Sequence, residues 1–273
     1  MGKAKYDHHF ARIVDRDGLG EWLMYEEKAY QELQQWQQRV QRRPSLIDAL
    51  SKTVQGRINR IIPERVHRAI TTAIKQMVRG VLFGARYTTA QPLQHAGLQQ
   101  REEAVQKKIE RYSITAAAEG GVTGAGGLLL GLADFPILLG IKLKMLFDIA
   151  AQYGFDVKDY KERLYILYIF QLAFSSQQHR RQVYTHMAHW EQTAQTLPQN
   201  EHDFDWHSLQ QEYRDYIDLA KMAQLIPGIG AVVGFVVNRK LINQLGTTAM
   251  NAYRMRWFAH SQRYTKASTS QLI

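Results

Sequence analysis

The chain has 273 residues, with 35 Lys and Arg against 25 Asp and Glu and a formal net charge of +10. It contains no cysteine, which excludes disulfide scaffolds, cysteine nucleophiles, iron–sulfur clusters and thiolate zinc sites. The mean hydropathy of −0.38 excludes a polytopic transporter but leaves a peripheral or hairpin-anchored membrane protein open. The length suits one large domain or two small ones.

The positive charge is concentrated towards the N-terminus. Residues 1–113 carry 20 basic and 12 acidic groups, a net of +8, whereas residues 114–273 carry 15 and 13, a net of +2. We therefore expect a basic N-terminal region, 1–113, whose field attracts an anionic partner. The first residues contain neither the apolar core nor the cleavage site of a secretory signal, which predicts a cytoplasmic location.

Helical periodicity dominates the N-terminal region. Residues 21–43 form a polar, Gln-rich pattern that includes Trp22 and Trp36 and is stopped before Pro44. Residues 46–83 carry apolar side chains at steps of three and four, and Pro63 is expected to divide this segment into two helices.

The opposite face of residues 46–83 is basic and consists of Lys52, Arg57, Arg60, Arg65, Arg68, Lys75 and Arg79. Such a face suits either an anionic membrane surface or the solvated outside of a core helix. Because no recognised DNA-binding motif accompanies it, we expect no nucleic acid partner.

Further along the chain, residues 91–111 predict a polar covering helix, and residues 159–175 predict a helix rich in tyrosine and leucine. Two glycine-rich apolar runs stand out. The first, 120–141, holds seven glycines and a single charge, Asp134, and the second, 222–238, holds no charge. Breaks at Asp134–Pro136 and at Pro227–Gly228 predict two paired helical hairpins rather than simple membrane spans. Such hairpins lie within the protein or dip into one leaflet.

The glycines of these runs have a spacing that favours close helix packing. Gly120, Gly124, Gly127 and Gly131 follow one another at steps of four, three and four, which would place them on one helix face. Gly230 and Gly234 repeat the device in the second run. Neither run matches the dinucleotide fingerprint or the P-loop, so we expect no cofactor.

Residues 179–215 are polar and are expected to form an insertion or arm. They contain two clusters, one of His186, His189 and Glu191 and one of His202, Asp203, Asp205 and His207. Neither cluster has the zinc motif of two histidines around a glutamate, so we interpret both as solvated surface and expect no metal site. No motif assigns a catalytic residue.

Asp134 is the polar residue that the sequence singles out. A buried carboxylate at this position would bind a proton or a cation. The favoured interpretation is that Asp134 caps the helix that follows the expected break, with Pro136 in the first turn of that helix.

Three motifs in the chain resemble the bacterial EcsC family: residues 123–136 with the sequence ending Ala-Asp-Phe-Pro, residues 149–156 around Tyr-Gly, and residues 226–238 with Pro-Gly-Ile-Gly. The residues that carry the resemblance are Gly124, Gly126, Gly127, Gly131, Asp134, Pro136, Tyr153, Gly154, Pro227, Gly228, Gly230, Gly234 and Asn238. The resemblance spans about residues 20–260. It implies a bacterial, helical, membrane-associated protein without an assigned catalytic residue, from a family named after a gene beside an ABC transporter pair linked to secretion.

We therefore predict an all-α protein with a single EcsC-like domain, in which the basic region 1–113 precedes a glycine-rich core, 114–273. The leading functional hypothesis is a non-catalytic accessory protein at the inner face of the cell membrane that assists or regulates an ABC transporter or secretion system. One alternative is a small-molecule or lipid binder, or an enzyme, with a pocket between the hairpins around Asp134. Another is a soluble scaffold that docks partners through the helix bearing Trp22 and Trp36.

Overall fold

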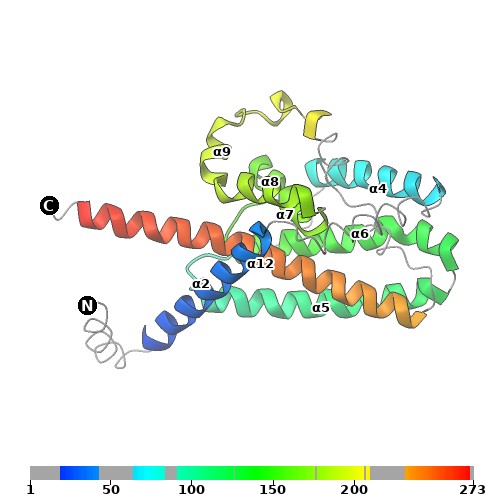
Figure 1. Ribbon diagram of the computed structural model, residues 1–273, viewed down its shortest axis with the longest axis horizontal. Coiled ribbons are helices and arrows are strands. Elements are labelled where there is room, and N and C mark those ends of the chain that lie inside the picture. The colour runs from blue at the N-terminus through cyan, green and yellow to red at the C-terminus, as the bar shows by residue number, and fades with distance from the viewer. Residues whose placement is uncertain are drawn as a thin grey trace.

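The computed structural model describes residues 19–42, 64–83, 91–125, 127–175, 177–205, 207–209 and 231–270. The elements in chain order are α2 (Leu19–Gln41), α4 (Glu64–Phe83), α5 (Leu98–Ala125), α6 (Gly127–Gln152), α7 (Tyr160–Phe174), α8 (Gln177–Ala188), α9 (Trp190–Thr196), the short 3₁₀ helix η2 (Glu201–Asp203) and α12 (Ala231–Ser270). These residues form helices and connecting turns without a β-strand (Figure 1), which confirms the all-α prediction.

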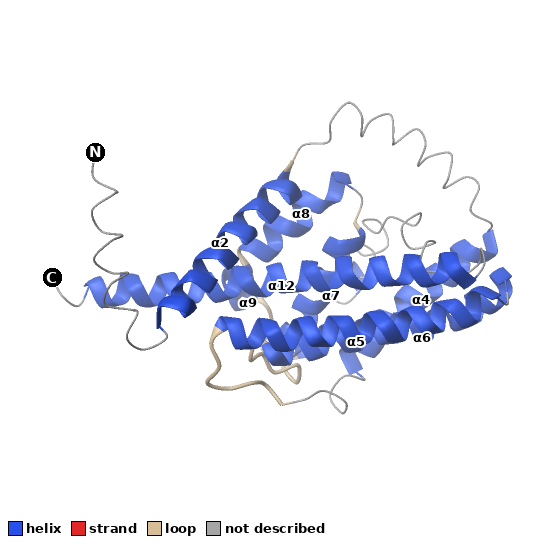
Figure 2. Cartoon of the chain, turned by 90° about the horizontal axis from the view of Figure 1, so that it is seen from below, coloured by secondary structure: helices blue, strands red, loops and turns tan. Residues whose placement is uncertain are grey.

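Three long helices, α5, α6 and α12, run side by side and form the body of the molecule (Figures 1 and 2). The closest approach between α5 and α12 is at Gly246, where an added Cβ would lie 2.6 Å from Cδ1 of Ile109. No larger side chain fits there without displacing Ile109, so this glycine allows the two helices to approach each other closely.

Helix α7 lies at the centre of the fold and packs against α4, α6, α8 and α12. Its sequence is apolar around nearly its whole circumference, as expected for a helix buried on all sides. The Asp159 side chain accepts a hydrogen bond from the backbone N–H of Lys161 and so caps the N-terminus, while Ser175 ends the helix. The predicted boundaries, 159–175, are confirmed.

Helix α2 confirms the prediction for residues 21–43 and crosses α12 beside α8 (Figure 2). Its buried stripe is Ala29, Leu33, Trp36 and Val40. Trp36 is only 7% exposed and packs edge-on against Tyr184 of α8. Trp36 is therefore a core residue and is not available as a docking surface, whereas the side chain of Trp22 lies outside the described part of the structure.

Helix α4 covers Glu64–Phe83, and Pro63 lies outside the described residues. Ala73, Ile74, Met77, Val78 and Val81 are buried, whereas Lys75 and Gln76 are exposed, so the predicted amphipathic pattern is present. The other half of the predicted segment, 46–62, lies outside the described residues.

The first glycine-rich run forms a hairpin, but its break is not at the predicted position. Helix α5 ends at Ala125 and α6 begins at Gly127, so the chain reverses around Gly126. Asp134 and Pro136 lie inside α6. Pro136 is exposed, so water can hydrogen-bond the backbone carbonyl that the proline leaves without a donor.

Two predictions about this run are therefore wrong. Asp134 cannot cap a following helix, because α6 is continuous on both sides of it. Gly120 and Gly124 belong to α5, whereas Gly127 and Gly131 belong to α6. Their even spacing in the sequence consequently does not place all four on one helix face, since the chain reverses between the two pairs.

The segment predicted as a polar arm is folded against the core over most of its length. Val183, Met187 and Trp190, from α8 and α9, are buried. Trp190 packs against the rings of Tyr165 and Tyr168 on α7. Tyr184 and Leu209 are buried as well, so the apolar side chains of this otherwise polar sequence hold the segment on the core.

Candidate functional site

A buried ion pair joins the helices of the bundle. The Glu102 carboxylate on α5 is fully buried and accepts two hydrogen bonds from the Arg254 guanidinium on α12, from Nε at 2.7 Å and from Nη2 at 2.6 Å. Tyr25 of α2 and Tyr153, which follows α6, donate their hydroxyl groups to the two carboxylate oxygens at 2.7 and 2.8 Å. The remaining Arg254 nitrogen, Nη1, donates to Glu32 of α2. Four segments of the chain therefore meet at one carboxylate.

Both tyrosines act as hydrogen-bond donors to Glu102 at neutral pH. Burial, and then the neighbouring Glu102 carboxylate, raise the pKa of Tyr25 and of Tyr153 well above the ordinary value. Each phenol stays protonated and directs its proton at Glu102. The charge of Glu102 is therefore matched by Arg254, and both of its oxygens are already hydrogen-bonded, so Glu102 is not placed to act as a general base.

A second cluster lies two residues further along α12. Arg256 pairs with the buried Glu162 of α7 at 2.6 Å and with Glu191 of α9 at 3.1 Å. Its guanidinium carbon lies 3.7 Å from the ring centroid of Phe155, a cation–π arrangement. The Tyr253 hydroxyl donates to Glu162 at 2.6 Å. Arg254 and Arg256 thus tie α12 to the helices on both of its sides.

The Tyr–Gly motif of residues 153 and 154 has a clear local role. Gly154 has φ +91°, and an added Cβ would lie 2.9 Å from Nη1 of Arg101. The Arg101 guanidinium donates to the backbone carbonyls of Leu93, Ala96 and Gln152. Glycine is needed here both for the backbone conformation and for the close approach of Arg101, which fixes the segment before α5 against the end of α6.

A lysine is buried between α6 and α12. Lys142 is fully buried, and its Nζ donates to Oδ1 of Asn238 at 3.3 Å and to the backbone carbonyl of Leu138 at 3.4 Å. It forms no ion pair with a carboxylate of the described residues. Burial lowers the pKa of Lys142 to about 7. Asn238, one of the motif residues, accepts this hydrogen bond and so links α12 to α6.

The remaining motif residues are only partly described. Gly124 lies in α5, Gly127 and Gly131 in α6, and Gly234 in α12. Gly126, Pro227, Gly228 and Gly230 lie outside the described residues. Of the basic face, Arg68 and Lys75 are exposed on α4, whereas the side chains of Arg65 and Arg79 are not described and Lys52, Arg57 and Arg60 fall outside the described ranges.

Neither histidine cluster forms a ligand set. His186 stacks on Tyr168, and the Asp205 carboxylate accepts hydrogen bonds from the backbone and hydroxyl groups of Ser208. Within the described ranges, no group of three His, Asp or Glu side chains converges in a way that could hold a metal ion. No helix in the same part of the chain combines the length and apolar composition needed to cross a bilayer.

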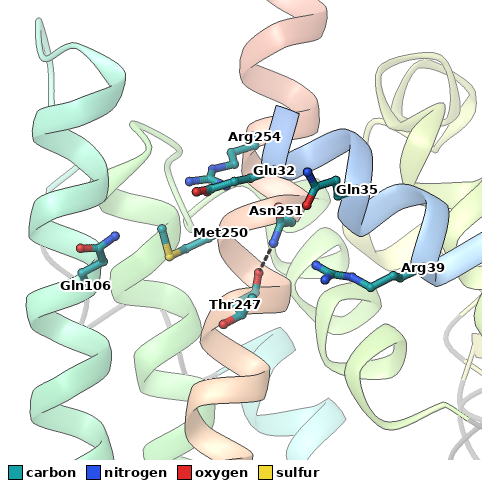
Figure 3. Close-up of a pocket in the computed structure, with 8 residues that line it drawn as sticks. All are labelled: Glu32, Gln35, Arg39, Gln106, Thr247, Met250, Asn251 and Arg254. Atoms are coloured by element: carbon teal, nitrogen blue, oxygen red, sulfur yellow. Dashed lines mark hydrogen bonds and ion pairs between the residues drawn. The ribbon is translucent and has the colours of Figure 1, made fainter. Parts of the chain in front are cut away.

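A pocket of about 250 Å³ lies between α2, α5 and α12 (Figure 3). Its lining consists of Glu32, Gln35, Arg39, Gln106, Thr247, Met250, Asn251 and Arg254. Because the buried ion pair of Glu102 and Arg254 lies behind it, the pocket has a rigid inner wall. The small-molecule hypothesis had placed a pocket around Asp134, whereas this one involves α2 and lies beside the middle of α12.

The sequence analysis did not single out Glu102 or Arg254. A signal was present, because Leu98, Glu102, Val105 and Ile109 follow one another at helical spacing and place Glu102 on the apolar stripe of α5. The partner, Arg254, is 152 positions away. No local pattern connects two residues at such a distance.

The order of these motifs and helices agrees with one protein family. The model of the EcsC protein family matches residues 27–258. The chain belongs to the EcsC family. The match includes the Glu102–Arg254 pair, the Tyr–Gly turn and the segment 179–215 that the sequence predicted as a polar arm, and it confirms the resemblance that the motifs carried.

Two bacterial relatives support this assignment. Protein EcsC of Bacillus subtilis (strain 168) is 43% identical over 227 residues, which cover 83% of this chain and 93% of that protein. Uncharacterized protein YdbA of the same organism is 27% identical over 245 residues, which cover 82% of this chain and 90% of that protein. No solved structure matches the chain.

The Glu102–Arg254 pair predicts a large effect of a small substitution. Glu102→Gln should lower the free energy of unfolding by about 3–5 kcal/mol, because it leaves the buried Arg254 charge without its carboxylate. Glu103→Gln, at the exposed neighbouring position, should change it by less than about 0.5 kcal/mol. Urea denaturation of the three proteins gives the comparison, and equal stability of the two variants would contradict a central role for the pair.

The buried Lys142 predicts a dependence of stability on pH. Between about pH 7 and 10 the unfolded chain binds a proton at Lys142 that the folded protein does not, so this lysine makes stability rise with pH, by at most about 1.4 kcal/mol per pH unit. As the pH rises across this range, the wild-type protein should therefore gain stability relative to Lys142→Met.

The matched control is Lys107→Met, at an exposed position of α5. The stability difference between this variant and the wild-type protein should stay constant from neutral to alkaline pH. A Lys142→Met profile parallel to that of the wild-type protein would mean that Lys142 is charged in the folded state.

Proposed function

We propose that this EcsC-family protein is a non-catalytic accessory protein that binds peripherally to the inner face of the cell membrane. The contact would be made by the end of the bundle where α5 turns into α6 and where α12 begins, termed here the turn end. Figures 1 and 2 both place these segments at the same end of the molecule, with α4 alongside. The observation that carries the proposal is the apolar surface exposed on the helices that lead to this end.

Exposed apolar side chains lie on both helices of the hairpin. Ile114 on α5 is 60% exposed and Ile137 on α6 is 58% exposed, each about three helical turns from the chain reversal. Between residues 112 and 141 the only charged residues are Glu119 and Asp134. An apolar surface of this kind on a helical hairpin is typical of a segment that contacts another apolar phase or partner.

Basic side chains lie on the helices beside this surface. Arg239 and Lys240 are exposed close to the start of α12, and Arg68 and Lys75 are exposed on α4, which packs on α6. Each basic group near anionic headgroups contributes about 1 kcal/mol to membrane binding. The combination of apolar contact and basic flanks supports binding to an anionic bilayer.

A role in transport is the second part of the proposal and rests on the family resemblance. At the membrane, the protein would assist or regulate an ABC transporter or secretion system. The buried Glu102–Arg254 pair supports an accessory rather than a catalytic role, because both oxygens of Glu102 are occupied by Arg254 and the two tyrosine hydroxyls.

Vesicle flotation tests membrane binding. The wild-type protein should float with vesicles of phosphatidylglycerol and phosphatidylcholine at low salt, and less with phosphatidylcholine alone. Reversing both charges in the variant Arg239→Glu/Lys240→Glu should weaken binding about thirtyfold, because two attractive contributions are lost. The variant Ile114→Ser/Ile137→Ser should weaken binding at both low and high salt, since its effect is apolar.

Control variants on α2, at the other end of the molecule, separate a local contact from a general charge effect. Lys28→Glu/Arg39→Glu changes the net charge by the same amount, and Met24→Ser removes a side chain that is 70% exposed. Both controls should float like the wild-type protein. A wild-type protein that stays at the bottom of the gradient at low salt, or controls that lose as much binding, would overturn the proposal.

The role in transport predicts a defined partner. Affinity purification from detergent-solubilised bacterial membranes should enrich subunits of an ABC transporter or secretion system, identified by mass spectrometry. The enrichment should fall with Arg239→Glu/Lys240→Glu and persist with Lys28→Glu/Arg39→Glu. Enrichment of the same proteins by the affinity tag alone would contradict this part of the proposal.

A further inference from the structure

The pocket between α2, α5 and α12 offers hydrogen-bonding groups that the protein itself does not use. The Arg39 guanidinium and the amides of Gln35 and Gln106 make no hydrogen bond to other described residues, and all three side chains are exposed at the rim. Figure 3 places Arg39 and Gln106 on opposite sides of the pocket, from α2 and α5. The rim therefore offers one guanidinium group and two amide groups to a ligand.

The inner wall is buried and partly unsatisfied. Asn251 is 5% exposed, and its Nδ2 donates to the backbone carbonyl of Thr247 at 2.9 Å. Its Oδ1 has no hydrogen-bond partner among the residues that the structure describes. A buried acceptor without a donor is costly, and Asn251 lines the pocket next to the apolar side chain of Met250.

The charges of the pocket are arranged as a pair of opposite sign. Arg254 is neutralised by the two hydrogen bonds to Glu102. Glu32 gives only one oxygen, Oε2, to Arg254 at 2.9 Å, which leaves its Oε1 as an acceptor among the described residues. The groups left for a ligand are thus a carboxylate oxygen at Glu32 and a guanidinium at Arg39.

The spacing of these two charges sets the length of a ligand that would contact both. Glu32 and Arg39 lie seven residues apart on α2, which corresponds to about 10 Å along the helix axis. Three extended amino-acid residues span about 10 Å. The amide side chains of Gln35, between the charged positions on α2, and of Gln106, across the pocket on α5, are suited to the N–H and C=O groups of a peptide backbone.

We infer that this pocket binds a short peptide with free termini, about three residues long. The C-terminal carboxylate pairs with Arg39, the N-terminal ammonium group donates to Glu32, and the backbone amides bind Gln35 and Gln106. Met250 provides the apolar floor. This inference does not depend on membrane binding, since the pocket lies along the bundle and not at its turn end.

Triglycine is the probe that tests the inference, measured by isothermal titration calorimetry alongside N-acetyl-triglycine and triglycine amide. The wild-type protein should bind triglycine saturably, and blocking either terminus should weaken binding about tenfold, the effect of one hydrogen bond to a charged group. Arg39→Gln should weaken triglycine binding by a similar factor and remove the penalty for amidation. It should leave the penalty for acetylation in place.

Glu32→Gln should give the reverse pattern, with the penalty for acetylation lost and that for amidation kept. Lys28→Gln, on the same helix but outside the pocket, is the matched control and should bind all three probes like the wild-type protein. Thermal unfolding of each variant establishes that it is folded. The inference is overturned if triglycine does not bind saturably, or if the control and pocket variants weaken binding equally.

Discussion

The arrangement of the helices depends on a single buried ion pair, that of Glu102 with Arg254. The carboxylate receives two hydrogen bonds from the guanidinium and two from tyrosine hydroxyls, so each of its oxygens is satisfied. A charge buried this completely is tolerated only with such partners. Because the partners come from α2, α12 and the turn after α6, the pair fixes how these segments lie against α5. A shift of any one segment would leave a buried charge without its hydrogen bonds.

A second ion pair constrains α12 in the same way. On the other side of α12, Arg256 forms ion pairs with Glu162 and Glu191. Aromatic rings pack around these pairs. Lys142 differs, because its only side-chain partner is the amide of Asn238. Burial therefore lowers the pKa of Lys142 to about 7, whereas Arg254 and Arg256 stay charged. The groups offered to partners lie outside this core, at the turn end of the bundle and in the pocket beside α2.

A helix could be predicted where its own residues, without contacts from other helices, produce the sequence pattern. The boundaries of α7 follow from the Asp159 cap and from continuous apolar sequence. The break in the first glycine-rich run was misplaced because a proline is a strong helix breaker in water, yet Pro136 lies on an exposed face where the helix tolerates it. The actual reversal, around Gly126, has a weaker local signal. Trp36 was misjudged for a similar reason, since its burial depends on Tyr184 of a distant helix.

The sequence by itself determined the helical class, the positions of α2 and α7, the amphipathic stripe of α4 and membership of the EcsC family. Each depends on the order of residues over a few helical turns or on short motifs. Only the tertiary structure decided which charged residues are buried, where the pocket lies and which apolar side chains remain exposed. The reason is the distance along the chain: Glu102 and Arg254 are 152 positions apart, and Lys142 and Asn238 are 96 apart. A charged residue has the same appearance in a sequence whether it faces water or a partner from another helix.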